Sequence, residues 1–104
     1  MRRTLPAALL AASFALAAIA PAHAVPACIE GQRKVEEASA LRFQARQDAR
    51  LGDHDRVCDT LDEVGDRFHD AQDAFRDCGA DVVAIDLTSE LRTLRVAKRV
   101  NRCD

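Results

Sequence analysis

The chain contains four cysteines, Cys28, Cys58, Cys78 and Cys103, and their positions restrict its folding more than any other feature. All four follow an N-terminal segment that is typical of an export signal. Export leads to an oxidising compartment, where an even number of cysteines in a short chain indicates a disulfide framework. We therefore expect two disulfides and unreactive, oxidised sulfur atoms.

The first 24 residues have the layout of a Sec-type signal peptide. Arg2 and Arg3 form a positive start, residues 5–20 carry no charge, and Ala22-His23-Ala24 places small residues at the two positions that a signal peptidase recognises. Cleavage after Ala24 predicts a periplasmic or secreted protein.

A membrane anchor is the competing interpretation of this segment. Its uncharged stretch has sixteen residues, is interrupted by Pro6 and Ser13, and is shorter than the ~20 residues that cross a bilayer. We expect no membrane span in the exported part, which is one small domain over residues 25–104. A domain of this size has a limited core and depends on covalent links.

The charge and the aromatic content of residues 25–104 argue against nucleic-acid binding. Without Arg2 and Arg3, thirteen basic and seventeen acidic side chains remain, so the net charge is −4. Nucleic-acid binding rests on neutralising phosphates and often on aromatic stacking. This part of the chain has no Trp or Tyr, and its only aromatic residues are Phe43, Phe68 and Phe75.

The strongest periodic pattern predicts a helix over residues 53–78. Its apolar positions alternate spacings of four and three, which places them on one face of a helix. Asp53 or Asp55 is expected to cap its start, and Gly79 suits the left-handed position after its end. The apolar positions are Val57, Leu61, Val64, Phe68, Ala71, Phe75 and Cys78.

Two further helices are predicted on either side. Residues 27–51 are rich in good helix formers, and Gly52, which follows them, is expected to stop the helix. Asp81 is expected to cap a third helix, which is predicted to bend or fray after Leu94, because the later apolar residues leave its stripe. The first helix has a looser stripe at Val35, Ala38, Leu41, Ala45 and Ala49, and the third has Ala84, Leu87, Leu91 and Leu94.

Short turns at Gly52 and at Gly79 make successive helices antiparallel neighbours, so the prediction is an all-α, up-down-up bundle of three helices. Cys58 and Cys78 lie ~30 Å apart on one helix, and a bridge needs Cα atoms within about 7 Å. Cys28 and Cys58 are separated in the same way by the first helix. The remaining pairing is Cys28 with Cys78 and Cys58 with Cys103.

Charge placement suggests a basic surface at one end of the bundle. Ion pairing with the acidic second helix is the favoured interpretation, because residues 53–79 hold nine acids and only three bases. The alternative is a site for an anion or an acidic partner. Its candidate residues are Arg42, Arg46, Arg50, Arg95, Arg99 and Arg102.

No catalytic or cofactor motif is present in the sequence, so we expect a protein that is not an enzyme and holds no cofactor. There is no G-x-S-x-G, H-E-x-x-H or C-x-x-C. An acidic ridge on the second helix is a weak candidate for divalent cations, since one helix offers ligands from one side only. Its central residues are Asp66, His69, Asp70 and Asp73.

Apolar residues outside the predicted stripes suggest contact with another protein, although they can also widen the core. Phe43 lies off the first stripe, and the third helix has a second set at Val82, Ile85, Val96 and Val100. We therefore predict a non-catalytic envelope protein of the inhibitor, immunity or stress-accessory type that binds another periplasmic or secreted protein. A homodimer is a possible form, and a divalent-cation binder is the alternative.

Overall fold

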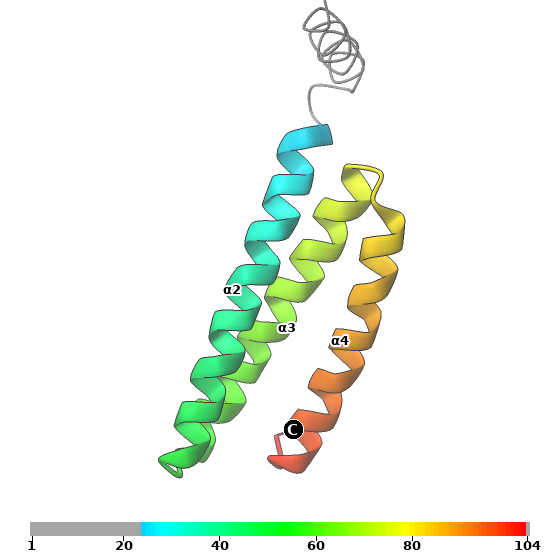
Figure 1. Cartoon of the computed structure of the whole chain (residues 1–104). Coiled ribbons are helices and arrows are strands. Elements are labelled where there is room, and N and C mark those ends of the chain that lie inside the picture. The colour runs from blue at the N-terminus through cyan, green and yellow to red at the C-terminus, as the bar shows by residue number, and fades with distance from the viewer. Residues whose placement is uncertain (1–23, 104) are drawn as a thin grey trace, which may run out of the picture.

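A computed structural model describes residues 24–103, and these residues form three α-helices without any strand. The helices are α2 (Ala24–Arg50), α3 (His54–Asp77) and α4 (Asp81–Val100) (Figure 1). The prediction of an all-helical chain is confirmed for this part. Residues 1–23 of the predicted signal peptide lie outside it, and its last residue, Ala24, is the first residue of α2.

The apolar stripe of α3 forms the centre of the core. Val57, Leu61, Val64, Phe68 and Phe75 are all buried, as their spacing predicts. The helix begins where the Asp53 carboxylate accepts a hydrogen bond from the backbone N–H of Arg56, which satisfies one of the free donors of the first turn.

Both turns use glycine in the left-handed region. The φ angle of Gly52 is 74° and that of Gly79 is 79°, values that a residue with a Cβ rarely adopts. These two glycines allow the chain to reverse within three residues between successive helices.

The stripe of α4 is also buried as predicted, at Ala84, Leu87, Leu91 and Leu94. Two expectations about its ends were wrong. Ala80 occupies the cap position without a side-chain hydrogen bond, and Asp81 is already the first helical residue, where its charge still favours the positive end of the helix dipole. The helix also continues past Leu94 to Val100, because Val96 and Val100 turn to the outer surface and leave the backbone hydrogen bonds intact.

Small side chains attach α2 to α3. Ala38 and Ala45 are buried, whereas Ala49, which the loose stripe assigned to the core, is exposed. Gly31 is buried against Phe75, and a Cβ at this position would lie 2.9 Å from the phenyl ring. The close approach of the two helices therefore depends on the absence of a side chain at Gly31.

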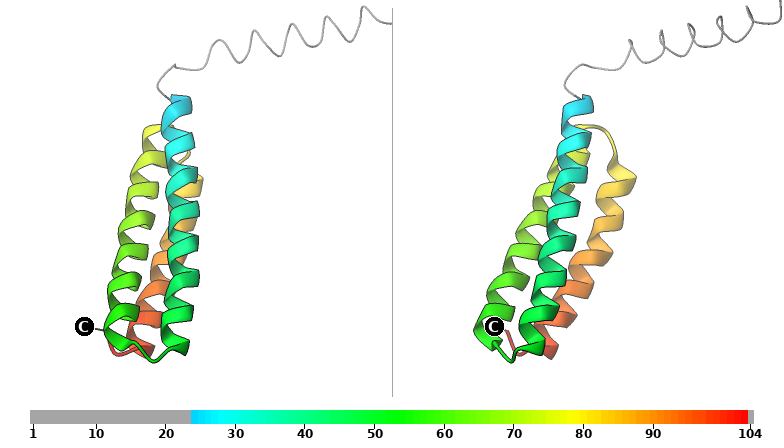
Figure 2. Two further views of the ribbon diagram at one scale, coloured as in Figure 1. Left: turned by 90° about the vertical axis from the view of Figure 1, so that its left-hand side faces the viewer. Right: turned by 60° about the vertical axis from the view of Figure 1, so that its left-hand side comes forward.

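The central helix α3 packs against both neighbours, whereas no Cα atom of α2 comes within 8 Å of one in α4. The α2–α3 turn lies at the same end as the C-terminal residues, and the α3–α4 turn lies beside the start of α2 (Figure 1). Figure 2 shows the three helices as a long, narrow array in two further views.

Two disulfides join the ends of this array in the predicted pairing. Cys28 and Cys78 have Cα atoms 5.4 Å apart, and so do Cys58 and Cys103. His54 adds a contact beside the second bridge, because its Nε2 atom lies 2.7 Å from the carbonyl oxygen of Asn101. The last turn of α4 is thereby held against the start of α3.

Candidate functional site

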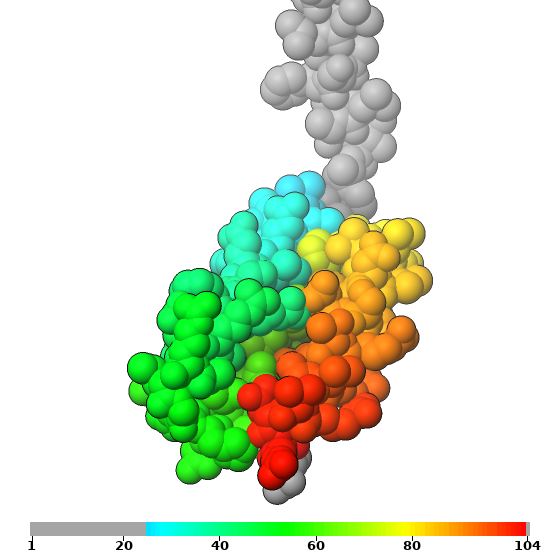
Figure 3. Space-filling view, turned by 60° about the horizontal axis from the view of Figure 1, so that its bottom comes forward, coloured from blue at the N-terminus to red at the C-terminus, as the bar shows by residue number. Residues whose placement is uncertain are grey.

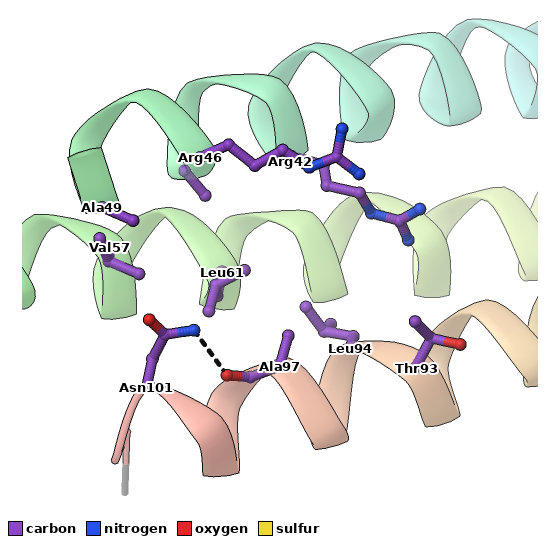
Figure 4. A pocket seen from close by; sticks show the side chains of 10 residues that line it. Arg42, Arg46, Ala49, Val57, Leu61, Thr93, Leu94, Ala97 and Asn101 are labelled. Atoms are coloured by element: carbon purple, nitrogen blue, oxygen red, sulfur yellow. Dashed lines mark hydrogen bonds between the residues drawn. The ribbon is translucent and has the colours of Figure 1, made fainter.

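A hollow of about 210 Å³ lies between α2 and α4 near the α2–α3 turn. Its floor is Val57 and Leu61 of α3, and Figure 4 shows side chains from all three helices converging on it. Figure 3 views the molecule from this end, with α3 visible between the other two helices. The walls are Arg42, Ala45, Arg46 and Ala49 of α2, Thr93, Leu94 and Ala97 of α4, and Asn101, which directly follows α4.

The hollow exists because alanine occupies the facing positions. Ala45 and Ala49 on α2 and Ala97 on α4 are too short to meet across the gap. The Asn101 amide nitrogen donates to the carbonyl oxygen of Ala97 at 2.8 Å, so it is held at the rim on its own helix. Small-molecule pockets usually measure about 300–1,000 Å³. This hollow therefore suits one or two apolar side chains of a protein segment.

Arg42 closes the gap between α2 and α4 above this hollow. Its guanidinium donates to the Glu90 carboxylate at 2.8 Å and lies 5.2 Å from the centre of the Phe68 ring. The sequence placed Arg42 with five other arginines in a candidate anion site. The structure instead uses it as a bridge between two helices, and its charge is already paired.

A second, wider hollow of about 530 Å³ lies on the other side of this bridge, toward the α3–α4 turn. Phe75 forms its floor, with Val35 on α2 and Val83 and Leu87 on α4. We call the two hollows together the α2/α4 groove. It is apolar at its base along α3 and is crossed once, by the Arg42–Glu90 pair.

The remaining arginines do not converge on one site. Arg46 lines the first hollow, and Arg50 is exposed in the last turn of the same helix. Arg95 lines a different pocket between α3 and α4, together with His69 and Lys98. Arg99 and Arg102 are exposed. Of the six candidate arginines, only Arg42 and Arg46 therefore line the α2/α4 groove.

Ion pairs occupy much of the acidic ridge of α3. The Asp62 carboxylate lies 2.5 Å from Lys98 Nζ, that of Asp70 lies 3.7 Å from Lys34 Nζ, and that of Asp73 lies 3.5 Å from an Arg76 nitrogen. Within residues 24–103, no three His, Cys, Asp or Glu side chains come together as metal ligands would. Asp66 and His69 line the pocket that contains Arg95 and Lys98, and these cations disfavour a bound metal ion.

A buried polar network joins α3 to α4, and a partly exposed ion pair joins α3 to α2. The buried Gln72 amide donates to the carbonyl oxygen of Ala84 at 2.9 Å and to the Thr88 hydroxyl at 3.2 Å. On the other side, Arg67 Nε lies 3.2 Å from a Glu37 oxygen but does not direct its N–H toward it. The first contact is a satisfied buried network, and the second is an ion pair without a hydrogen bond.

The exposed apolar candidates lie outside the groove. Phe43 is 61% exposed on α2, and Ile85 and Val96 are exposed on α4 together with Val82 and Val100. None of them widens the core, which was the alternative explanation for their positions. They remain candidates for contact with a partner.

The α2/α4 groove was not predicted from the sequence. The available signal was small residues at facing positions, Ala45 and Ala49 of α2 and Ala97 of α4, which indicate a shortage of side-chain volume between the two helices. The alanine pattern alone could not reveal the groove, because a sequence pattern does not give the distance between two helices.

No described helix combines the length and hydropathy that a membrane crossing requires. Comparison with family models, with curated proteins and with solved structures finds no match to this chain.

Proposed function

We propose that the protein is a non-catalytic, exported helical protein that binds another envelope protein, and that the α2/α4 groove takes a segment of that partner. The bundle is proposed to be up-down-up, as the short turns at residues 51–53 and 78–80 suggest. Export and removal of residues 1–24 are part of the same proposal and rest on the sequence of that segment.

The observation that carries the proposal is the chemistry of the first hollow. Its base is apolar, at Val57, Leu61 and Leu94, and an exposed arginine, Arg46, stands at its rim. A helix or extended segment with one or two apolar anchors beside an acidic residue complements such a surface. The absence of catalysis is inferred from the sequence motifs and not from the groove.

The experiment compares two alanines on α2. A photoreactive amino acid replaces Ala49, which lines the hollow, or Ala40, which is exposed on the same helix and does not line it. After irradiation in the native envelope and mass spectrometry, position 49 should crosslink to one envelope protein and position 40 should not.

Binding to the identified partner is then measured with the purified proteins. Ala49→Trp fills the hollow and should weaken binding by about tenfold or more, whereas Ala40→Trp should leave it unchanged. Equal crosslinking from both positions, or full affinity in Ala49→Trp, would refute the groove as the binding site. N-terminal sequencing of the exported protein should begin at Val25, and an intact leader would refute the proposed export.

A further inference from the structure

A stripe on the outer face of α4 has no partner within the molecule. Six residues spaced three or four apart lie within about 80° of one another around the helix axis, at ~100° per residue. None is charged, and the four apolar members are 50–75% exposed. We call this the α4 stripe; it consists of Val82, Ile85, Ser89, Thr93, Val96 and Val100.

Its two hydroxyls need no hydrogen bond from water. Ser89 Oγ donates to the carbonyl oxygen of Asp86 at 2.8 Å, and Thr93 Oγ1 donates to that of Ser89 at 3.0 Å. Burying a hydroxyl is costly mainly when it loses its partner, and these partners belong to the same helix. The whole stripe can therefore be covered by a second apolar surface without leaving a free donor.

The order of residues along the stripe matches its own reverse. In an antiparallel pair of α4 helices centred near Leu91, Val82 of one copy meets Val100 of the other, Ile85 meets Val96, and Ser89 meets Thr93. A two-fold interface has this property, because each contact between two positions occurs twice.

The charges of α4 favour the same orientation. Residues 81–91 contain three acids and no base, and residues 92–102 contain five bases and no acid. An antiparallel pair places the acidic half of each copy beside the basic half of the other, with Asp81 and Arg99 on the same side of the stripe. A parallel pair would place like charges together, and an anionic membrane would be repelled by the acidic half.

We propose that the α4 stripe is a self-association surface whose occupant is the α4 helix of a second copy of this chain, in antiparallel orientation. The stripe centre is turned about 100° from the groove-lining residues of α4. The two surfaces share only Thr93, at the edge of each. Dimerisation and partner binding therefore use largely different surfaces, and this inference does not depend on the proposed function. One pair of helices ~30 Å long buries less than the ~1,200 Å² of a standard interface, so the dissociation constant of the dimer should lie above about 1 μM.

Sedimentation of the oxidised protein over about 10 μM to 1 mM tests the proposal. The wild-type dimer fraction should rise with concentration. Ile85→Lys places an unpaired charge against Val96 of the other copy and should weaken association by about tenfold or more. Val83→Lys, on the same helix but toward the groove, should leave association unchanged.

The double variant Ile85→Lys/Val96→Glu determines the orientation. In the antiparallel pair the new lysine of each copy faces the new glutamate of the other, so association should return to within about threefold of wild type. In a parallel pair like charges would meet and association would stay weak. A wild-type protein that remains monomeric at 1 mM, an Ile85→Lys variant that associates normally, or a double variant without recovery would each overturn the proposal. Helical circular dichroism and a thiol assay check that each variant keeps its fold and both disulfides.

Discussion

The two interfaces of α3 differ in the size of the side chains that they bury. The side facing α4 buries three leucines, Leu87, Leu91 and Leu94, whereas the side facing α2 receives mainly Ala38, Ala45 and the bare backbone of Gly31. Burial of a leucine contributes about 1.5–3 kcal/mol, and an alanine contributes much less. The comparison shows that burial of large apolar side chains stabilises the α3–α4 interface, whereas small residues let α2 pack closely against α3.

Ion pairs and a disulfide also join α2 to α3, and they offset part of the smaller apolar burial at this interface. Lys34 and Glu37 of α2 lie within ion-pair distance of Asp70 and Arg67 of α3. These side chains are partly exposed, so each pair contributes under about 1 kcal/mol. The attachment of α2 to α3 therefore depends more on the Cys28–Cys78 disulfide than the attachment of α4 depends on Cys58–Cys103, because α3 and α4 already share a leucine interface.

Removal of either disulfide should have the largest effect on the free energy of unfolding. Each disulfide closes a loop of similar length, with sequence separations of 50 and 45. The chain-entropy model then predicts nearly equal losses, up to about 4 kcal/mol of unfolding free energy. Guanidinium denaturation of Cys28→Ser/Cys78→Ser and of Cys58→Ser/Cys103→Ser measures them.

We expect hydrogen exchange to separate the two variants even if their losses match. Without Cys28–Cys78, the amides of residues 29–31 should exchange faster, because few apolar contacts hold the start of α2. Faster exchange along the whole of α4 in this variant would contradict the contrast between the two interfaces.

Replacement of two helical glycines with alanine should have an intermediate effect on the free energy of unfolding. A Cβ at Gly31 would lie 2.9 Å from the buried Phe75 ring, whereas one at Gly65 would lie 3.0 Å from the end of the flexible Leu94 side chain. Overpacking costs about 1–3 kcal/mol, and replacing a helical glycine with alanine regains about 1 kcal/mol. Gly31→Ala should therefore lose up to about 2 kcal/mol of unfolding free energy, and Gly65→Ala should stay within about 1 kcal/mol of wild type. Equal losses in thermal or chemical denaturation would show that both interfaces are equally tight.

The smallest effect concerns the surface pairs of α2. A hydrogen bond from Arg33 is the main cause that lowers the pKa of Glu30 from its ordinary value of 4.5. Because the folded-state pKa is the lower one, the stabilisation is present above pH 4.5 and is lost as the pH falls through the lowered pKa. NMR titration of the Glu30 carboxyl should show the lowered pKa in wild type and a return toward 4.5 in Arg33→Gln. A wild-type pKa at or above 4.5 would contradict the pair.

Much of the fold could be predicted from the sequence because it depends on local geometry. The stripe of α3, its Asp53 cap and the turns at Gly52 and Gly79 follow from helix period and backbone preference. The cap of α4 was assigned to Asp81 and not to Ala80, because the sequence offers a capping side chain there and cannot show that the helix starts one residue earlier. Similarly, Val96 and Val100 suggested a break in α4, although they are only the outer face of an intact helix.

By itself, the sequence determined the number of helices and the partners of the four cysteines, because helix rise fixes how far apart two sulfur atoms on one rod must lie. The tertiary structure alone decided that Arg42 bridges α2 and α4, that Ala49 faces an open groove, and that the α4 stripe stays uncovered. These features depend on the distance between helices, and that distance is set by the side-chain volumes of three helices at once.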